Sequence, residues 1–411
     1  EEIYMLFGFV PLDTPVIELG EVLFAKAGGE TSGLIYNFKK GDTDIGLRFD
    51  LTVPLSRYVA SHHNDLSFPF RRYQISKVYR RERAQKGRFN EFYQADIDII
   101  GNEKLSVLYD AEIPSIMYRV FRSLGLEKFH IRFNNRKLLN GFYQNLGLEE
   151  QAVDILRLVD KVDKIGSDNV LEGLLELGVS KENAEKILSF IQISGNSDDV
   201  LTTLKELKIQ NELFLLGMHE LELVHSSLKS LGVPETHYIL DLKITRGLDY
   251  YTGTVFEITA DDYPAWSTIC AGGRYDNLAG VFTDKKLPGI GMSLGLTRFF
   301  SLLEEEGLIQ ASAATTADVL VIPMIEDATY ALFVSNLLRE AKIKTQTYFG
   351  DAKFKNKMMY ANKIKVPYVI ILGEDEEKEQ VISLKNMISG EQERLSLNSF
   401  IEVLSQKLRQ K

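Results

Sequence analysis

The side chains best suited to chemistry crowd into one short charged segment. Within nine residues the chain carries Arg80, Arg81, Arg83, Lys86 and Arg88. Arginine outnumbers lysine there, and its rigid guanidinium can bind a phosphate or carboxylate through two parallel hydrogen bonds. The segment therefore favours a site for a fixed polyanion such as a nucleoside triphosphate. A solvated, charged hairpin loop is the alternative interpretation.

A second candidate arginine ends a glycine-rich segment. The stretch from Gly289 to Arg298 is mostly apolar and small, so Arg298 is the one charged side chain in it. A strand that leads into a helix, with glycine permitting close packing, would produce the same pattern.

A third segment, Arg246–Glu257, sets ionisable side chains beside an aromatic pair. Asp249 directly precedes Tyr250 and Tyr251, and Arg246 lies shortly before Asp249 in the same segment. Burial of either charge without a partner would cost free energy, so a functional role is attractive. A core strand with a tyrosine pair is the simpler alternative.

The elements that must position these groups change along the chain. Residues 70–100 predict two long strands around a polar turn at 85–87, and their aromatic flanks favour a place inside a sheet. Residues 149–232 repeat apolar side chains at helical spacing, which predicts a helical insertion. Strand patterns return at Ile239–Leu242 and Thr254–Thr259.

The C-terminal quarter has a different pattern. Small residues over 309–317 predict a linker, and strands then alternate with helices over 318–411. We expect strands at Asp318–Pro323, Thr345–Phe349 and Tyr368–Gly373, helices at Ala328–Ala341 and Phe354–Ile364, a hairpin at Val381–Leu397 and a last helix. This alternation predicts a small α/β domain with a mostly parallel sheet.

Bulk composition excludes several classes of protein. The 411 residues are 45% hydrophobic and 26% charged, typical of a soluble chain of two to four domains. The single cysteine, Cys270, rules out an internal disulfide and a cysteine-rich zinc site, and it fits a reducing compartment. With no long apolar run and no basic N-terminal region, we expect neither a membrane span nor a signal peptide. The net charge of −10 requires any nucleic-acid contact to come from a local basic patch.

Taken together, these segments resemble a known family. The charged hairpin resembles motif 2 of class II aminoacyl-tRNA synthetases, and Gly289–Arg298 resembles their motif 3. Arg246–Glu257 and Ala271–Asp276 are similar to two elements particular to the histidyl-tRNA synthetase family. The resemblance covers nearly the whole chain, with its motifs in the expected order.

The resemblance implies a fold and a division into domains. It implies an α+β class II catalytic domain, an antiparallel sheet flanked by helices, from residues 1–148 and 233–308. The helical insertion would occupy 149–232, the linker 309–317, and a C-terminal α/β anticodon-binding domain 318–411.

It also implies a two-step reaction. ATP would activate L-histidine to histidyl-adenylate with release of pyrophosphate, and the histidyl group would then pass to the 3′ end of tRNA(His) with release of AMP. Arg80 would clamp the α-phosphate and Arg246 would bridge it to the histidine carboxylate, which makes these two the expected catalytic residues. Arg88 and Arg298 would complete the ATP site. Mg²⁺ would neutralise the outer phosphates without a dedicated protein site.

For the amino acid, the resemblance implies a polar pocket. Asp98 and Tyr251 would contact the imidazole ring, with Tyr275 nearby, and Asp50, Thr52 and Gln94 would hold the other end. The full expected histidine-binding set is Asp50, Thr52, Gln94, Asp98, Arg246, Tyr250, Tyr251 and Tyr275. Asp50 and Asp98 are aspartates where many members of the family have glutamate. The six histidines show no metal-ligand spacing.

The same resemblance implies binding partners and defines the alternative functions. Motif 1, here Glu2–Glu18 with Pro15, builds a homodimer in the family, whose members usually carry a further leading segment. Lys353, Lys355 and Lys357 could contact tRNA phosphates or simply form a solvated helix face. We expect a cytoplasmic enzyme without membrane contact. The alternatives are a regulatory paralogue in histidine biosynthesis, a class II synthetase for glycine, threonine or proline, and a non-catalytic α/β scaffold.

Overall fold

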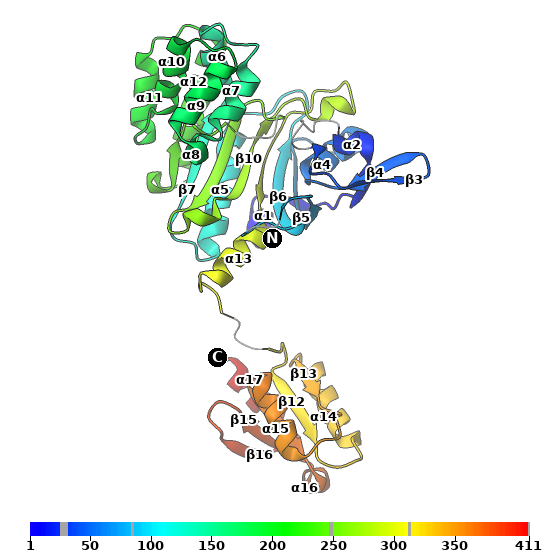
Figure 1. The fold of residues 1–411 in the computed structure, drawn as a ribbon. Helices are drawn as coiled ribbons and strands as arrows, with labels where there is room; N and C mark the ends of the chain where they lie inside the picture. Colours follow the sequence, from blue (N-terminus) through cyan, green and yellow to red (C-terminus); the bar gives the residue numbers. More distant parts are fainter. Residues whose placement is uncertain (25–31, 84–85, 246–249, 311–313, 410–411) are drawn as a thin grey trace. The chain divides into compact units, whose positions relative to one another are not determined.

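The computed structural model describes residues 1–24, 32–83, 86–245, 250–310 and 314–409. The chain forms two compact units, Glu1–Glu306 and Gly307–Lys411 (Figure 1). Arg246 and Asp249 of the expected histidine segment lie outside the described residues. The finer division of the first unit at residues 148 and 233, and the linker bounds, stay predictions.

An eight-stranded sheet forms the centre of the first unit. Its order is β1 (Val10–Pro11), β5 (Phe70–Tyr79), β6 (Glu91–Ile100), β11 (Gly289–Leu294), β10 (Thr268–Tyr275), β9 (Thr254–Ala260), β7 (Phe129–Asn135) and β8 (Tyr238–Leu240). All inner pairings are antiparallel, and only the outermost pairs, β1 with β5 and β7 with β8, are parallel. The expected antiparallel sheet is confirmed.

The predicted long hairpin is also confirmed. Strands β5 and β6 pair without a break from Phe70 opposite Ile100 to Tyr79 opposite Glu91. Both strands have a neighbour on their other side, as the aromatic flanks predicted. Residues at alternate positions point to the same face of a strand, so Gln94, Asp96 and Asp98 share one face of β6.

Helices cover the sheet and extend its far end. Helix α5 (Leu108–Ser123) contacts β11, and α13 (Leu296–Glu305) contacts β6. The predicted helical stretch forms a bundle of α7 (Ala152–Val159), α8 (Val162–Ile165), α9 (Ser167–Glu176), α10 (Lys181–Ile191), α11 (Ser197–Glu206) and α12 (Glu212–Ser230) beside α6 (Arg136–Asn145) (Figure 1). Asn135, Ser180, Asn196 and Asn211 cap four of these helices by accepting a backbone N–H in the first turn, which defines where each helix begins.

A smaller sheet lies near the N-terminus. It is antiparallel, in the order β2 (Ile17–Leu19), β4 (Thr43–Leu47) and β3 (Asn37–Lys40), beside α2 (Gly20–Phe24) and α4 (Thr52–Ser61). Its β3–β4 hairpin projects from the first unit (Figure 1). A short helix α1 (Glu2–Leu6) begins the chain.

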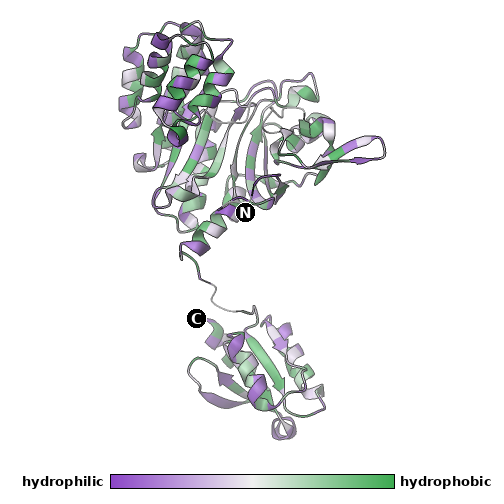
Figure 2. Ribbon diagram, viewed as in Figure 1, coloured by the Kyte–Doolittle hydropathy of each residue, from purple (hydrophilic) through white to green (hydrophobic). Residues whose placement is uncertain are grey.

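The second unit is a five-stranded sheet with helices. Its order is β13 (Thr345–Thr347), β12 (Val319–Pro323), β14 (Tyr368–Leu372), β15 (Val381–Asn386) and β16 (Gln392–Ser396), with α14 (Thr329–Glu340), α15 (Phe354–Lys363), α16 (Glu374–Glu379) and α17 (Phe400–Arg409). The core strands are strongly apolar, as Figure 2 shows. The expected mostly parallel sheet is wrong: β13, β12 and β14 are parallel, but β15 returns antiparallel to β14 after α16, and the short hairpin turn sets β16 antiparallel to β15.

One expected phosphate contact is also wrong. Lys353 and Lys355 are exposed, but Lys357 is buried and its ammonium donates a 2.7 Å hydrogen bond to the carbonyl of Pro323. Its stem crosses the core side of α15, so this charge stabilises the fold instead of facing solvent. No helix in the described part of the chain is both long and apolar enough to cross a bilayer.

Candidate active site

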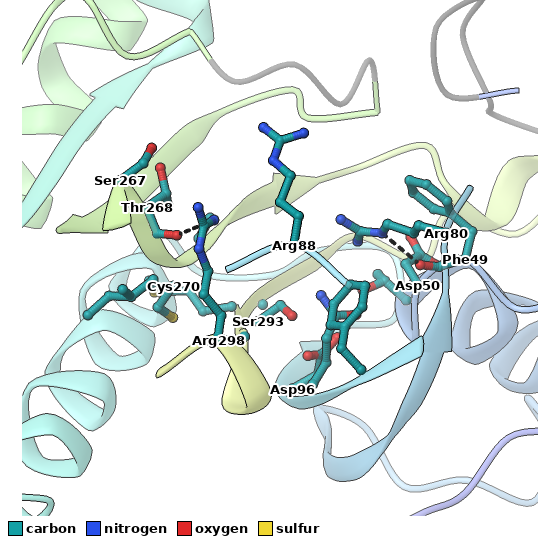
Figure 3. A pocket seen from close by; sticks show the side chains of 18 of the residues that line it. Phe49, Asp50, Arg80, Arg88, Asp96, Ser267, Thr268, Cys270, Ser293 and Arg298 are labelled. Carbon is teal, nitrogen blue, oxygen red and sulfur yellow. Dashed lines mark hydrogen bonds between the residues drawn. The ribbon is translucent and has the colours of Figure 1, made fainter. Parts of the chain in front are cut away.

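A cavity of about 420 Å³ lies over strands β6, β11 and β10 (Figure 3). The structure brings the described candidate residues together along its wall. They come from distant parts of the sequence: Asp50, Thr52, Arg80, Arg88, Gln94, Asp98, Tyr250, Tyr251, Tyr275 and Arg298. Arg246, the other candidate, lies outside the described residues, although its neighbours Tyr250 and Tyr251 line the cavity.

Arg80 is fixed at the end of β5. Its backbone N–H donates to the carbonyl of Asn90, which continues the hairpin pairing by one residue. Its side-chain Nε donates to the carbonyl of Phe49 at 3.2 Å, and its guanidinium lies 4.3 Å from the ring centroid of Phe49 and 5.2 Å from that of Phe92. Burial lowers the pKa of Arg80, although its ordinary value is high enough that the group stays charged. The result is a rigid cation that faces the cavity.

Arg298 forms a second fixed cation, at the start of α13. Its Nη1 donates to the carbonyl of Thr268 at 2.9 Å, while its buried Nε has no hydrogen-bond partner among the described residues. Burial lowers the pKa of Arg298, and repulsion from Arg88 lowers it further. Arg88 itself pairs with the Glu82 carboxylate at 3.3 Å. An anion bound between Arg88 and Arg298 would relieve their repulsion and complete the hydrogen bonding of Arg298.

A glycine holds the charged loop against this corner. Gly87 has a φ of 67°, which favours glycine, and a Cβ there would lie 3.1 Å from both Arg298 and the Trp266 ring. The preceding residue, Lys86, lies over the Trp266 ring and pairs with Glu305 at 3.3 Å. The loop that carries Arg88 is therefore anchored to α13.

The part of the cavity wall opposite the three arginines is lined by acidic and by uncharged polar side chains. Figure 3 shows Asp96 and Ser293 on one side of the cavity, with the guanidinium groups of Arg80, Arg88 and Arg298 on the other. Asp98 accepts a 2.7 Å hydrogen bond from the Tyr275 hydroxyl. Space for this carboxylate exists because its neighbour on β11 is Gly291, where a Cβ would lie 2.2 Å from Asp98 Oδ1.

The remaining candidates close the cavity from the α4 and Tyr250 sides. Asp50 Oδ1 accepts the backbone N–H of Val53 at 3.1 Å, which fixes it at the start of α4, and burial raises its pKa. Tyr250 lies with its ring centroid 4.7 Å from that of Tyr251 and 6.1 Å from that of Tyr275. Burial also raises the pKa of Tyr250 and Tyr275, so both stay hydrogen-bond donors at neutral pH.

Polar atoms without partners mark this wall as a binding surface. Gln94 Oε1 and Asp96 Oδ1 are buried and have no hydrogen-bond partner among the described residues. Buried polar atoms are almost always paired in folded proteins. Two such atoms on one cavity wall therefore indicate a polar ligand that completes them.

Sequence reasoning missed several lining residues. Asp96 was not predicted, although its alternation with Gln94 and Asp98 on β6 was a usable signal. Burial raises the pKa of Asp96 to about 8, so this acid is mainly neutral at pH 7. Glu82 and Lys164, which comes from α8 of the helical bundle, also line the cavity. No pattern in the sequence links Lys164 to this site.

The cavity suits Mg²⁺ only as a companion of a phosphate ligand. Among the described residues no three His, Cys, Asp or Glu side chains group to hold a metal. The Glu82 carboxylate lines the cavity next to Arg88. Mg²⁺ commonly uses one or two carboxylates together with substrate phosphates, and Glu82 fits that mode.

Comparison with known proteins places this site in a family. Residues 1–299 match the family described as histidyl-tRNA synthetase, and residues 318–407 match the anticodon binding domain. The chain is 54% identical over 402 residues to the histidine–tRNA ligase of Clostridium tetani, covering 98% of this chain and 91% of that protein. It is 48% identical over 404 residues to that of Finegoldia magna, covering 98% and 93%.

A solved structure agrees with these relatives. The crystal structure of histidyl-tRNA synthetase from Nostoc sp. PCC 7120 superposes with a TM-score of 0.86 at 40% identity, covering 99% of this chain and 93% of that one. The histidyl-tRNA synthetase family and the class II fold that the sequence resemblance implied are confirmed. The chain belongs to the histidyl-tRNA synthetase family.

Proposed function

We propose that this chain joins L-histidine to tRNA(His) in two steps, using ATP and releasing AMP and pyrophosphate. One observation carries the proposal. A single cavity sets the fixed cations Arg80, Arg88 and Arg298 on one side and Asp96 and Ser293 on the other, and the buried polar groups Gln94 and Asp98 also line it. This arrangement suits a triphosphate beside a polar amino acid.

In the first step the histidine carboxylate attacks the ATP α-phosphorus and pyrophosphate leaves. Neither bond change needs a protein nucleophile, so catalysis depends on alignment and on fixed positive charge. Arg80 contacts the α-phosphate, and Arg246 bridges it to the attacking carboxylate. Arg88 and Arg298 hold the rest of the nucleotide. Glu82 would hold Mg²⁺ beside the nucleotide, and the ion would supply positive charge that neutralises the outer phosphates.

The opposite side of the cavity selects the amino acid. Asp98 and Tyr251 bind the imidazole ring, Tyr250 and Tyr275 pack around it, and Gln94 contacts the backbone end of the substrate. Asp50 and Thr52, at the start of α4, complete that end of the site. A site that hydrogen-bonds a polar substrate group rejects analogues without it by about 10⁴–10⁵, since its own buried groups stay unpaired.

In the second step a ribose hydroxyl at the tRNA 3′ end attacks the acyl carbon and AMP leaves. Residues 318–407 bind the anticodon region, with exposed Lys353 and Lys355 as phosphate contacts. A chain of net charge −10 needs such local positive charge to bind RNA. The proposal places this reaction in the cytoplasm, where ATP and tRNA are available.

The proposal includes a homodimer built on the N-terminal region. Large apolar side chains are exposed there: Met5, Leu6, Val10, Val16, Ile17 and Leu19. Leu6 is 82% exposed, which is costly for a side chain that never meets a partner. Sedimentation of the full chain at micromolar concentration should give twice the monomer mass, and Leu6→Asp with Ile17→Asp should shift it toward the monomer.

Aminoacylation tests the proposal directly. The protein is incubated with ATP, Mg²⁺, labelled histidine and total tRNA, and label in acid-precipitable RNA is measured. We expect histidine, and no other amino acid, to enter tRNA. A folded protein that binds histidine but charges no tRNA would instead favour a regulatory role, and charging with glycine, threonine or proline would favour another class II specificity.

A further inference from the structure

A buried arginine lies beside the amino-acid end of the cavity. Arg72, on β5, is fully buried, and it does not line the cavity. It stands opposite Asp98 in the β5–β6 register, on the same face of the sheet. Isolated buried arginines are rare because removing the charge from water is costly, so this one requires an explanation.

The guanidinium of Arg72 contacts both Asp98 and the backbone beside α4. Its Nη2 lies 3.4 Å from Asp98 Oδ2 and donates a 2.5 Å hydrogen bond to the carbonyl of Leu51. Leu51 lies between Asp50 and Thr52, two candidate substrate contacts. The guanidinium therefore links the Asp98 strand to the loop that begins α4.

The neighbouring residue, Arg71, is an arginine with a common structural role. Arg71 points to the other face of β5, where it pairs with the partly exposed Glu112 at 2.9 Å and donates to the carbonyl of Phe7. Its ion-pair, hydrogen-bond and ring contacts, to Glu112, Phe7, Phe9 and Tyr109, all lie outside the cavity wall. The two adjacent arginines are thus a matched pair, with Arg72 on the face of the sheet that carries the site and Arg71 on the other face.

We propose that Arg72 is a positioning residue for histidine selection: it holds Asp98 as a fixed anion that accepts a hydrogen bond from the imidazole ring. The inference rests on the proposed function. Asp98 receives the Tyr275 hydroxyl on one oxygen and faces Arg72 with the other. The Tyr275 hydrogen bond and the ion pair with Arg72 constrain the carboxylate from two sides, and Asp98 Oδ2 has no hydrogen-bond partner among the described residues, which leaves it able to accept one from a ligand.

The charged groups around Asp98 support this role for Arg72. The titratable and charged groups that act on Asp98 from the surrounding elements are Arg72, Asp50, Asp96, Tyr250 and Tyr275. Burial raises the pKa of Asp98, while Arg72 and the Tyr275 hydrogen bond lower it. Arg72 also lowers the pKa of Asp96 and Asp50, so one guanidinium favours the ionised form of three buried acids, although burial keeps Asp96 mainly neutral at pH 7. An anionic Asp98 is an acceptor only, and it requires an N–H on the ring.

The test compares Arg72→Met with Arg71→Met in histidine-dependent ATP–pyrophosphate exchange. Truncating one partner of a buried charge pair weakens binding by at least about 30-fold. We expect Arg72→Met to raise the KM for histidine by that factor, with kcat and the KM for ATP within about threefold of wild type. Arg72→Lys should recover part of the loss, and Arg71→Met should match wild type.

The pH profile separates positioning from packing. Without Arg72 the pKa of Asp98 rises, so the acid limb of kcat/KM for histidine should move to higher pH in Arg72→Met. In an Asp98→Asn background no carboxylate remains to hold, so adding Arg72→Met should change the KM for histidine by less than about threefold. A purely structural role would lower activity at every pH and in both backgrounds.

Folding is checked independently, so a failed variant does not leave the inference open. Unfolding temperature and ATP affinity are measured for each protein, and Arg72→Met/Asp98→Asn, which removes both charges, replaces Arg72→Met if the latter does not fold. An unchanged KM for histidine in folded Arg72→Met would overturn the inference. Wild-type protein without histidine-dependent exchange would instead refute the proposed function itself.

Discussion

Arg298 offers the sharpest test of the nucleotide side of the site, through Arg298→Met. The structure gives this guanidinium one hydrogen bond, to Thr268, and leaves its buried Nε without a partner among the described residues. Burial and Arg88 both lower its pKa, which means that the protein without ligand is destabilised by this charge. Methionine keeps the apolar part of the side chain and removes the cation.

Two effects of opposite sign follow from Arg298→Met. Loss of one fixed donor costs about 2.7–4 kcal/mol of transition-state stabilisation, so kcat/KM for ATP should fall by about 10²–10³. The unfolding temperature of the unliganded protein should stay the same or rise slightly. A residue needed only for packing would lower both.

Thermal shift with ATP measures the contact itself. At ATP equal to 100 times its Kd, wild-type protein gains about 2.7 kcal/mol, whereas a variant that binds 100-fold more weakly gains only about 0.4 kcal/mol at the same concentration. Arg122→Met is the control, because Arg122 is a surface residue that pairs with the exposed Glu127. If ATP stabilises Arg298→Met as much as Arg122→Met, Arg298 does not contact ATP and the assignment is wrong.

Three further predictions concern other parts of the chain. Arg246→Ala should lower histidine-dependent exchange by at least about 10²-fold, as for loss of one transition-state donor, and near-normal exchange would refute its assigned role. Between pH 3.8 and about 8 the folded protein keeps a proton on Asp96 that the unfolded chain has released, so the free energy of unfolding falls as pH rises, by up to about 1.4 kcal/mol per pH unit. Asp96→Asn should therefore be more stable than wild type at pH 8.5 but similar at pH 4.5. An equal stability difference at both pH values would contradict the raised pKa. Lys357→Met should cost about 1–3 kcal/mol by leaving the Pro323 carbonyl without its donor, seen as a lower calorimetric transition for the C-terminal unit, whereas Lys355→Met should leave that transition unchanged.

Much of the architecture followed from local patterns. Strands β5 and β6 were predictable because aromatic and β-branched residues alternate on both sides of a polar turn. The helical bundle was predictable because apolar residues recur at helical spacing, and its caps lie at asparagine and serine residues. The sequence did not predict how much of the C-terminal sheet is antiparallel. Strand–helix alternation describes only β12 to β14, and β15 and β16 add antiparallel pairings beyond them.

The site was harder to derive from residues alone. Arg80 belongs to a cluster of basic residues and Arg298 is the one charge in its segment, but their meeting in one cavity depends on the pairing of β6 with β11, which no local pattern states. Nothing in the residues around Arg72 marks it as buried, and only its register with Asp98 shows its environment. Lys357 was misjudged for the same reason: a lysine on a helix gives no sign of which face is buried.

ATP–pyrophosphate exchange with each of the twenty amino acids tests the central claim most directly. It reports the first step alone, in the cavity that holds Arg80 and Asp98, and it needs no tRNA. The account predicts exchange with histidine and at least about 10⁴-fold lower efficiency with every other amino acid. Exchange driven by glycine, threonine or proline in place of histidine, or none with a folded protein, would contradict it.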